Sequence, residues 1–370
     1  MAQKARNADY TKEYNRKAIL RILRRNAMSR AELARITGLT RAATSLIVEE
    51  LLNEGMLMEL SPQSCGRGRS AIPLTLQTGR YYALGVHLAR RGCKVGLCDM
   101  AGNLLRHQEI AIQDDLIGPI ITVLEQMLQT VEKDRVLGIG VSSPGPVDTE
   151  RGRILNPPRF ERWHGIEVCR LLSEALGIPT YLEHDACALA LHQLEMGESR
   201  NFLLLLVNSG VGAGIVSRGK LLGGARHFTG ELGHTTIRFD GRLCECGNRG
   251  CLEAYAAIPR LLDGSHYASW QDLVDRVDRE PEARKLLDQE AMYLSAGIIN
   301  LLNLIRVDTV YLAGDVCCGF DKLAQRLQRE IGTRALGRST DRIRVLPADQ
   351  HPEVGILSAA DVVFSQFLTV

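Results

Sequence analysis

The segment CECGNRGCLEAYA at residues 244–256, with GELGH at residues 230–234 before it, decides the fold of this chain. Its cysteines stand in a C-x-C-x4-C pattern, at Cys244, Cys246 and Cys251. With His234, ten residues upstream, they offer three thiolates and one imidazole, a closed tetrahedral set typical of a structural zinc ion. The alternative is three unrelated thiols in one loop, which would be reactive and costly to order without an ion. We therefore expect Zn²⁺ at these four residues.

The composition is that of an ordinary globular protein. The chain has 370 residues, of which 45% are apolar and 24% charged, and this length suits two or three domains. Its longest apolar runs, such as residues 202–207, are too short to span a bilayer, and residues 1–17 lack the apolar core of a signal peptide. We expect a cytoplasmic protein without membrane insertion, whose ten cysteines are mostly buried thiols or metal ligands rather than disulfides.

Positive charge is concentrated near the N-terminus. Residues 1–70 contain 13 Lys or Arg and 7 Asp or Glu, a net charge of +6, whereas the remainder carries −4. A basic segment on a slightly acidic body indicates a polyanionic partner for that segment alone, although a solvated basic tail would show the same asymmetry.

Three helices are expected in quick succession in this basic segment. The first, residues 14–25, carries an apolar stripe at helical spacing. A capping box beginning at Ser29 starts the second helix, and Gly38 can end it in the left-handed conformation. Thr40 can cap a third helix that runs to about residue 53. The spacing is that of a helix-turn-helix, although other small helical bundles also contain two capped helices joined by a glycine turn.

The residues after the third helix favour a DNA-binding domain. Residues 55–60 and 72–76 are expected as two strands around a polar, glycine-rich tip, which together form a β-wing. Arginines on a slim tip suit phosphates or a narrow minor groove, although a flexible linker could have the same composition. We assign residues 1–76 to a winged helix-turn-helix that binds double-stranded operator DNA. Its expected DNA-contacting residues are Arg41, Ala42, Ser45, Arg67 and Arg69.

Beyond residue 81 the pattern becomes α/β. Strands are expected at residues 82–88, 93–99, 104–112, 136–141, 202–207, 214–216 and 310–313, and helices at 116–131 and 292–305. Strands interleaved with helices predict two lobes with a cleft between them. We place the small lobe at residues 81–185 and the large lobe, with the zinc loop, at residues 186–370. We also expect the C-terminal helix to pack back on the small lobe.

Six segments of this body resemble the ROK family of repressors, open reading frames and kinases. They are GIGVSSPGPVD (138–148), LEHDACALA (182–190), GVGAGIVSRGKLLGGA (210–225), GELGH (230–234), CECGNRGCLEAYA (244–256) and YLAGDV (311–316). The resemblance implies an actin-like, sugar-kinase fold in which the four residues named above hold the zinc. The preceding winged helix-turn-helix places the chain with the repressor branch, which is similar to regulators of xylose, N-acetylglucosamine and glucose genes.

The resemblance also implies a sugar pocket, with Asp185 at the position of the kinase general base. Sugar hydroxyls require carboxylates and amides in a cleft. The implied sugar contacts are Gly145, His184, Asp185, Glu231, His234 and Glu253. His184 and Cys187 stand where the family has asparagines, which leaves the identity of the sugar open.

The phosphate end of the cleft departs from the kinases. ROK kinases begin with Asp-x-Gly-Gly-Thr, whereas residues 87–91 of this chain read HLARR, so the acidic group that organises magnesium and the glycines that admit phosphate are both replaced. Asn208 and Ser209 replace Gly-Thr in a second phosphate loop, and Asp315 replaces a glycine near the adenosine position. These changes predict a kinase-like fold without kinase activity.

These patterns favour a transcriptional regulator, expected to be a repressor, that senses a sugar or sugar phosphate in a degenerate kinase cleft. One alternative is an ATP-dependent sugar kinase with an added DNA-binding domain, in which Asp185 would be catalytic. Another is an interaction protein whose body docks a regulatory partner protein. Because one winged helix per chain reads one half-site, we expect a homodimer or a tetramer built from such dimers.

Overall fold

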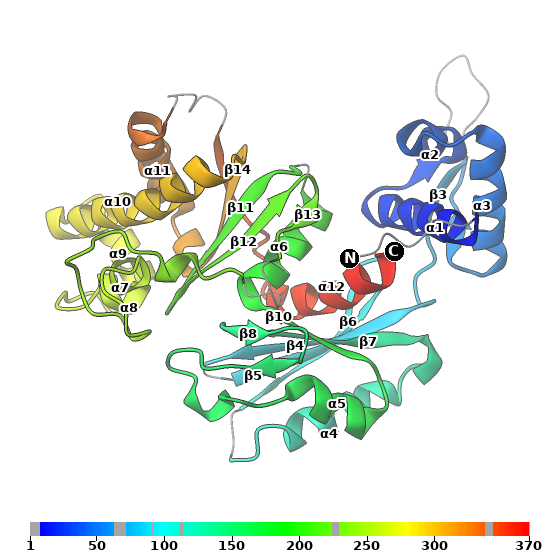
Figure 1. Cartoon of the computed structure of the whole chain (residues 1–370), viewed down its shortest axis with the longest axis horizontal. Coiled ribbons are helices and arrows are strands. Elements are labelled where there is room, and N and C mark those ends of the chain that lie inside the picture. The colour runs from blue at the N-terminus through cyan, green and yellow to red at the C-terminus, as the bar shows by residue number, and fades with distance from the viewer. Residues whose placement is uncertain are drawn as a thin grey trace.

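The computed structural model describes residues 8–62, 72–90, 92–111, 114–197, 199–223, 229–336 and 343–369. Three of the arginines considered above therefore lie outside the described residues, namely Arg67, Arg69 and Arg91. The chain forms an N-terminal head, here residues 8–62 and 72–76, beside two α/β lobes (Figure 1). Among the described helices, not one combines the length and the apolar character needed to cross a membrane.

The head contains three helices and a small antiparallel sheet. They are α1 (Ala8–Arg25), α2 (Arg30–Thr37) and α3 (Arg41–Asn53), with β1 (Met28–Ser29), β2 (Leu57–Glu59) and β3 (Pro73–Leu76) in the order β1-β3-β2. The predicted capping box is confirmed, because the Ser29 side chain accepts from the Glu32 amide and the Ser29 amide donates to the Glu32 carboxylate at 2.8 Å. Gly38 ends α2 at a φ of 73°, and the Thr40 hydroxyl accepts from the Ala43 amide at the start of α3.

The small lobe is built on a five-stranded sheet with the order β10-β7-β4-β5-β6. Its strands are β4 (Tyr82–Ala89), β5 (Gly92–Asp99), β6 (Leu104–Ile110), β7 (Val136–Ser143) and β10 (Thr180–His184), and the short pair β8 (Val147–Asp148) and β9 (Arg153–Ile154) follows β7. β4, β5 and β6 form an antiparallel meander, whereas β7 and β10 run parallel to β4. Two helices, α4 (Gly118–Leu128) and α5 (Val168–Leu176), share an apolar core with this sheet.

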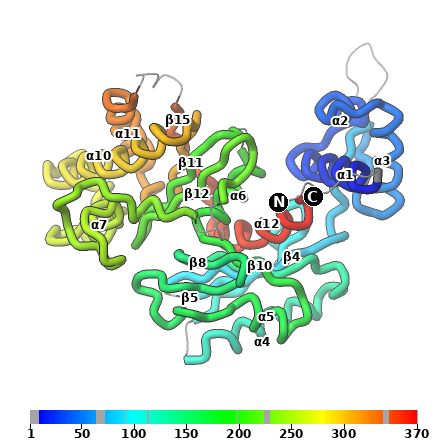
Figure 2. The backbone as a smooth tube through the Cα atoms, viewed as in Figure 1, coloured from blue at the N-terminus to red at the C-terminus, as the bar shows by residue number. Residues whose placement is uncertain are grey.

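The C-terminal helix α12 (Val354–Leu368) lies against the same sheet, between the two lobes and the head (Figure 1). Gly85 on β4 and Gly140 on β7 allow it to approach closely, because a Cβ at either position would clash with backbone atoms of α12. The apolar core of the head is continuous with α12, since Ile19 and Leu23 belong to one buried cluster with Phe364. The end of α12 accordingly lies beside α1 (Figure 2), where the Lys17 ammonium donates to the Thr369 carbonyl at 2.8 Å.

The large lobe contains a second five-stranded sheet, with the order β13-β12-β11-β14-β15. Its strands are β11 (Phe202–Val207), β12 (Val211–Ser217), β13 (Lys220–Leu221), β14 (Thr309–Gly314) and β15 (Arg344–Pro347). Its helices are α6 (Asp185–Met196), α7 (Glu253–Ala256), α8 (Ile258–Leu261), α9 (Trp270–Arg276), α10 (Pro281–Leu304) and α11 (Phe320–Arg334).

Two elements of the large lobe are longer than the sequence pattern predicts. β12 begins at Val211 rather than near residue 214, and its glycines hide its strand character. They are needed because α6 packs directly on this strand: a Cβ at Gly214 would collide with Ala190. α10 begins at Pro281, where the missing amide hydrogen costs nothing in a first helical turn.

Candidate functional site

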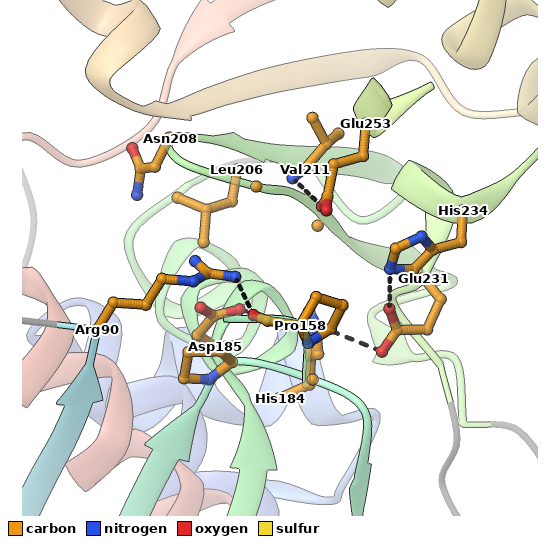
Figure 3. A pocket seen from close by; sticks show the side chains of 14 residues that line it. Arg90, Pro158, His184, Asp185, Leu206, Asn208, Val211, Glu231, His234 and Glu253 are labelled. Carbon is orange, nitrogen blue, oxygen red and sulfur yellow. Dashed lines mark hydrogen bonds and ion pairs between the residues drawn. The ribbon is translucent and has the colours of Figure 1, made fainter. Parts of the chain in front are cut away.

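All six residues that the sequence assigns to a sugar site line one pocket between the lobes (Figure 3). The small lobe supplies Gly145, which follows β7, and His184 and Asp185, which stand where β10 meets α6. The large lobe supplies the other three, Glu231, His234 and Glu253. The ends of parallel strands β7 and β10 therefore place one wall of the pocket, and loops of the large lobe place the opposite wall.

His184 forms the buried floor of this pocket. Its Nδ1 accepts the Ala186 amide at 3.2 Å and so caps α6, which leaves Nε2 to face the Glu231 carboxylate at 3.8 Å. Its imidazole also explains Gly145, because a Cβ there would clash with the His184 ring and with Glu231. The family has asparagine at this position. The larger side chain of His184 fits here because Gly145, which faces it, has no side chain.

Two carboxylates of the large lobe are held by different means. Burial raises the pKa of Glu231, against the effect of the His184 and His234 rings, so its carboxylate lies in a strongly desolvated position. Glu253 is pinned at both oxygens, by the Val211 amide at 2.9 Å and by the Arg159 guanidinium at 3.4 Å. Acceptors fixed in this way suit a ligand with several hydroxyl groups.

His234 joins the pocket to the cysteine cluster. Its Nδ1 lies 3.6 Å from Cys244 Sγ, while its Nε2 lies 3.9 Å from Glu231 Oε2 in the pocket. The ligand atoms of all four predicted metal residues lie within 4.8 Å of one another, and Cys246 Sγ and Cys251 Sγ are 3.7 Å apart. Two sulfurs bound tetrahedrally at about 2.3 Å from one ion would be about 3.8 Å apart. The cluster therefore has the donors and the spacing that a tetrahedral metal ion requires.

Two of the three thiols in this cluster, those of Cys244 and Cys251, are buried. Burial raises the pKa of the Cys251 thiol to about 12 and also raises the pKa of Cys244. The Asn248 side-chain amide donates a hydrogen bond to Cys251 Sγ at 3.4 Å, which holds this sulfur in place. A bound metal would reverse the pKa shifts, because it stabilises the thiolate outright.

The phosphate end of the cleft is lined by side chains of the small lobe that replace the first phosphate loop. The His87 ring is bonded through Nδ1 to Ser142 Oγ at 2.8 Å, and burial lowers the pKa of this histidine, which keeps it neutral. Arg90 donates to Ser209 Oγ at 2.9 Å across the cleft and to the Pro158 carbonyl at 3.3 Å. The replacement of the phosphate loop was visible in the sequence, but the bridge from Arg90 to the large lobe was not, because its partners are 68 and 119 residues away.

A second pocket adjoins the first at Arg90 and Asp185. It extends from His87 to Asp349 and His351, in the loop before α12. Asp315, another departure from the kinase pattern, donates its backbone amide to the Asn208 side chain at 2.7 Å and so ties together two segments of the large lobe.

The head exposes one side of α3. Thr44, Ile47, Val48 and Leu51 are buried as the apolar spacing predicts. The residues expected to face DNA, Arg41, Ala42 and Ser45, are all exposed, whereas Arg67 and Arg69 lie outside the described residues. Leu46 was not singled out in the sequence, yet its side chain is 62% exposed. It lies one residue beyond Ser45, and a leucine on the side of the helix opposite its apolar stripe is the signal that could have found it.

Residues 83–365 match the ROK family. The chain belongs to the ROK family. The xylose repressor of Bacillus subtilis is 27% identical over 376 residues, which cover 97% of this chain and 97% of the repressor. A solved ROK family transcriptional regulator, described as a homolog of the E. coli MLC protein, has a TM-score of 0.79 at 26% identity and covers 97% of this chain and 96% of that chain.

ROK enzymes match a smaller part of the chain. A ROK hexokinase from Thermus thermophilus has a TM-score of 0.65 at 28% identity, and the match covers 99% of the hexokinase but only 77% of this chain. The family match itself begins at residue 83, after the head. The head is therefore an addition to the ROK body, and the repressor and the regulator match the chain over a length that includes it.

Proposed function

We propose that this chain is a transcriptional repressor that binds operator DNA through its head and responds to a sugar or sugar phosphate in the cleft of its ROK body. One observation carries the proposal: a head with an exposed helix α3 is attached to a cleft that keeps its carboxylates but has lost its first phosphate loop. The repressor and regulator that match the chain along nearly its whole length support it.

The head acts as a winged helix-turn-helix. α3 is the recognition helix, and its exposed Arg41, Ala42 and Ser45 read base edges in the major groove. The wing is formed by β2 and β3, and its tip carries Arg67 and Arg69 as phosphate or minor-groove contacts. Residues 1–76 form this domain, and residues 81–185 and 186–370 form the two lobes of the sensor.

The body works as a sensor rather than as a kinase. Asp185 remains at the start of α6, where it could accept a proton from a sugar hydroxyl. Transfer of phosphate also requires a site for magnesium and for the nucleotide phosphates. His87 and Arg90 line that place, and both are hydrogen-bonded to protein atoms. Neither side chain offers the oxygen ligands that magnesium prefers, so the rival, an active sugar kinase with an added head, would need another residue to hold the ion.

The four-residue cluster binds a structural zinc ion. His234 Nδ1 and the thiolates of Cys244, Cys246 and Cys251 are its ligands. Zinc supplies a cross-link for the loop, and the same link fixes the His234 ring so that Nε2 faces the sugar pocket.

Ligand and DNA are coupled through the lobes. A sugar that contacts Asp185 from one lobe and Glu253 from the other favours closed lobes. In a homodimer or tetramer, closure changes the spacing of two heads, and that spacing decides whether both fit successive major grooves. A coupling free energy of about 1–3 kcal/mol would change DNA affinity roughly 5- to 150-fold.

Selection from a pool of random DNA duplexes tests the function. The full-length protein should enrich a pseudo-palindromic sequence, and at least one sugar or sugar phosphate of a broad panel should change its affinity for that sequence. The same panel, incubated with ATP and magnesium, should give no ATP consumption. Turnover that Asp185→Asn abolishes, together with no enriched sequence, would establish the kinase instead.

A further inference from the structure

We propose that the effector is an anionic sugar, one that carries a phosphate or a carboxylate, and that Arg90 is the residue that binds its charged group. This inference rests on the proposed function and narrows it, because it assigns the class of ligand and a contact that the predicted sugar residues do not include.

Arg90 stands at the junction of the two pockets, immediately after β4. Figure 3 shows its side chain extending from the end of its strand to the centre of the cleft, close to Pro158 and Asp185. Its guanidinium makes two hydrogen bonds, one to Ser209 of the large lobe and one to Pro158 of its own lobe. A guanidinium has five N–H donors in a planar fork, so most of its donor capacity remains available.

The charge of Arg90 is not neutralised by contact. Among the described residues, no carboxylate oxygen lies within 4.0 Å of its guanidinium nitrogens, and its Nε is buried without an acceptor. The neighbouring Arg159 differs, because it lies 3.0 Å from Glu245 and 3.4 Å from Glu253. Burial, reinforced by the positive charge of Arg159, lowers the pKa of Arg90 despite the opposing effect of Asp185, Glu253 and Glu245. Since an arginine keeps its proton, this direction means that the surroundings destabilise the cation, and an anion in contact with it would relieve that cost.

The space beside Arg90 is kept open by a glycine. A Cβ at Gly210 would lie 3.4 Å from one terminal nitrogen of Arg90 and 2.9 Å from Glu253 Oε2. Any side chain there would fill the gap between the cation and the carboxylate. The bare backbone leaves the guanidinium facing the cleft, with the Glu253 carboxylate across the gap from it.

The distribution of charge selects a ligand with two different ends. Asp185, Glu231 and Glu253 accept hydroxyl donors and repel an anion, so the neutral body of a sugar belongs among them. Arg90 has no ion-pair partner among the described residues, so a phosphate or carboxylate attached to the sugar belongs beside its guanidinium.

Calorimetry on the full-length, zinc-loaded protein tests the assignment. The probes are neutral hexoses, hexosamines and pentoses, the phosphate ester of each, the corresponding uronic acids, and inorganic phosphate alone. We expect a charged sugar to bind 10- to 100-fold more tightly than its neutral parent, which is the range for hydrogen bonds to charged groups. The phosphate and uronic-acid arms show which anion is used.

Two variants localise the effect. Arg90→Gln should remove the preference for the charged sugar and leave affinity for the neutral parent within about twofold, whereas Arg90→Lys should retain part of the preference. Arg151→Gln is the control. It removes an arginine of the same lobe whose side chain is 71% exposed, and it should leave the affinities for the charged and the neutral sugar unchanged. Melting curves of all variants verify folding.

The remaining outcomes separate this inference from the proposed function. If a neutral sugar binds as tightly as its charged form and still alters DNA affinity, the function stands and the role of Arg90 is wrong. The role is also wrong if inorganic phosphate alone binds as tightly as the sugar phosphate, or if Arg90→Gln weakens both forms equally. If nothing in the panel binds or alters DNA affinity, the proposed function is wrong as well.

Discussion

Arg24 on α1 of the head forms an ion pair with Asp361 on α12, and both side chains are only 6% exposed. The Arg24 guanidinium also donates to the Met100 carbonyl at 3.0 Å and lies 4.6 Å from the centre of the Phe364 ring. Asp361 in turn is bonded to His192 of α6. A buried charge of the head is thus neutralised by the sensor body, so the orientation of the head is tied to α12.

Removing the arginine should uncouple the head from the body. Arg24→Met leaves Asp361 buried with one partner fewer, and breaking a buried pair in this way costs about 3–5 kcal/mol. The double variant Arg24→Met with Asp361→Asn should be less destabilised than the sum of the single changes, because both act on the same pair. Calorimetric unfolding should show a separate, earlier transition for the head.

A surface arginine of the head provides the control for this prediction. Arg30 pairs with Glu49 and Glu59 at exposed positions, so Arg30→Met should cost no more than about 1 kcal/mol. An Arg24→Met protein that unfolds in one transition at the temperature of the Arg30→Met protein would contradict a coupling role for Arg24.

His192 predicts a pH dependence of stability. Its ring lies between Asp361 at 2.7 Å and Asp349 at 2.9 Å. Burial opposes its charge, but these two carboxylates raise the pKa of His192 to about 9. The folded pKa lies above the unfolded value of 6.5, so the stabilisation is complete below pH 6.5 and is lost as the pH rises through 9.

The size of this effect is about 3 kcal/mol, because the folded and unfolded pKa values differ by about 2.5 and each pKa unit corresponds to about 1.36 kcal/mol. Denaturation between pH 6 and 9.5 should show the decline in the parent protein and a flatter profile in His192→Gln, which cannot be protonated. Parallel profiles for the two proteins would show that this histidine is not charged in the folded chain.

The metal cluster predicts one zinc ion per chain. Cys251→Ser should abolish binding and lower the melting temperature of the body, because the ion cross-links a loop with little other regular structure. Elemental analysis of the purified protein measures the content. Cys169→Ser, a change outside the cluster, should keep the metal. A parent protein that contains no metal, and melts as the Cys251→Ser protein does, would refute the assignment.

Local patterns explain how much of the fold could be predicted. The capping box of Ser29 and the cysteine loop are defined within a few residues, so the sequence shows them directly. The family resemblance brought Gly145 and Glu231 to one pocket, although 86 residues of sequence separate them. The expected contacts of the wing tip stay predictions, since Arg67 and Arg69 lie outside the described residues.

The missed features depend on pairs that the fold alone creates. Arg24 and Asp361 are 337 residues apart, and His192 and Asp349 are 157 apart. Each of these side chains would be read as an ordinary surface charge in its own segment, because neither helical spacing nor a short motif marks it. Only the docking of α12 between head and lobes brings each pair together.

The exposed side of α3 leads to the last prediction, which concerns DNA. Arg41 and Ser45 lie on successive turns and face outward, and Leu46 beside them offers an apolar surface for thymine methyl groups. Arg41→Ala or Ser45→Ala should each weaken binding to a selected operator by about 1–3 kcal/mol if the side chain contacts a base. Leu46→Ala should reduce binding to the operator but not to the same duplex made with uracil in place of thymine, which lacks those methyl groups.

Arg276→Ala is the control for these changes, because it removes an equal charge from the large lobe and should leave DNA binding unchanged. Titrations at several salt concentrations separate the possible roles of Arg41: loss of a phosphate contact lowers the salt slope by about 1, whereas loss of a base contact changes specificity instead. Operator affinity that is unaffected by all three changes in α3 would show that another surface binds the DNA.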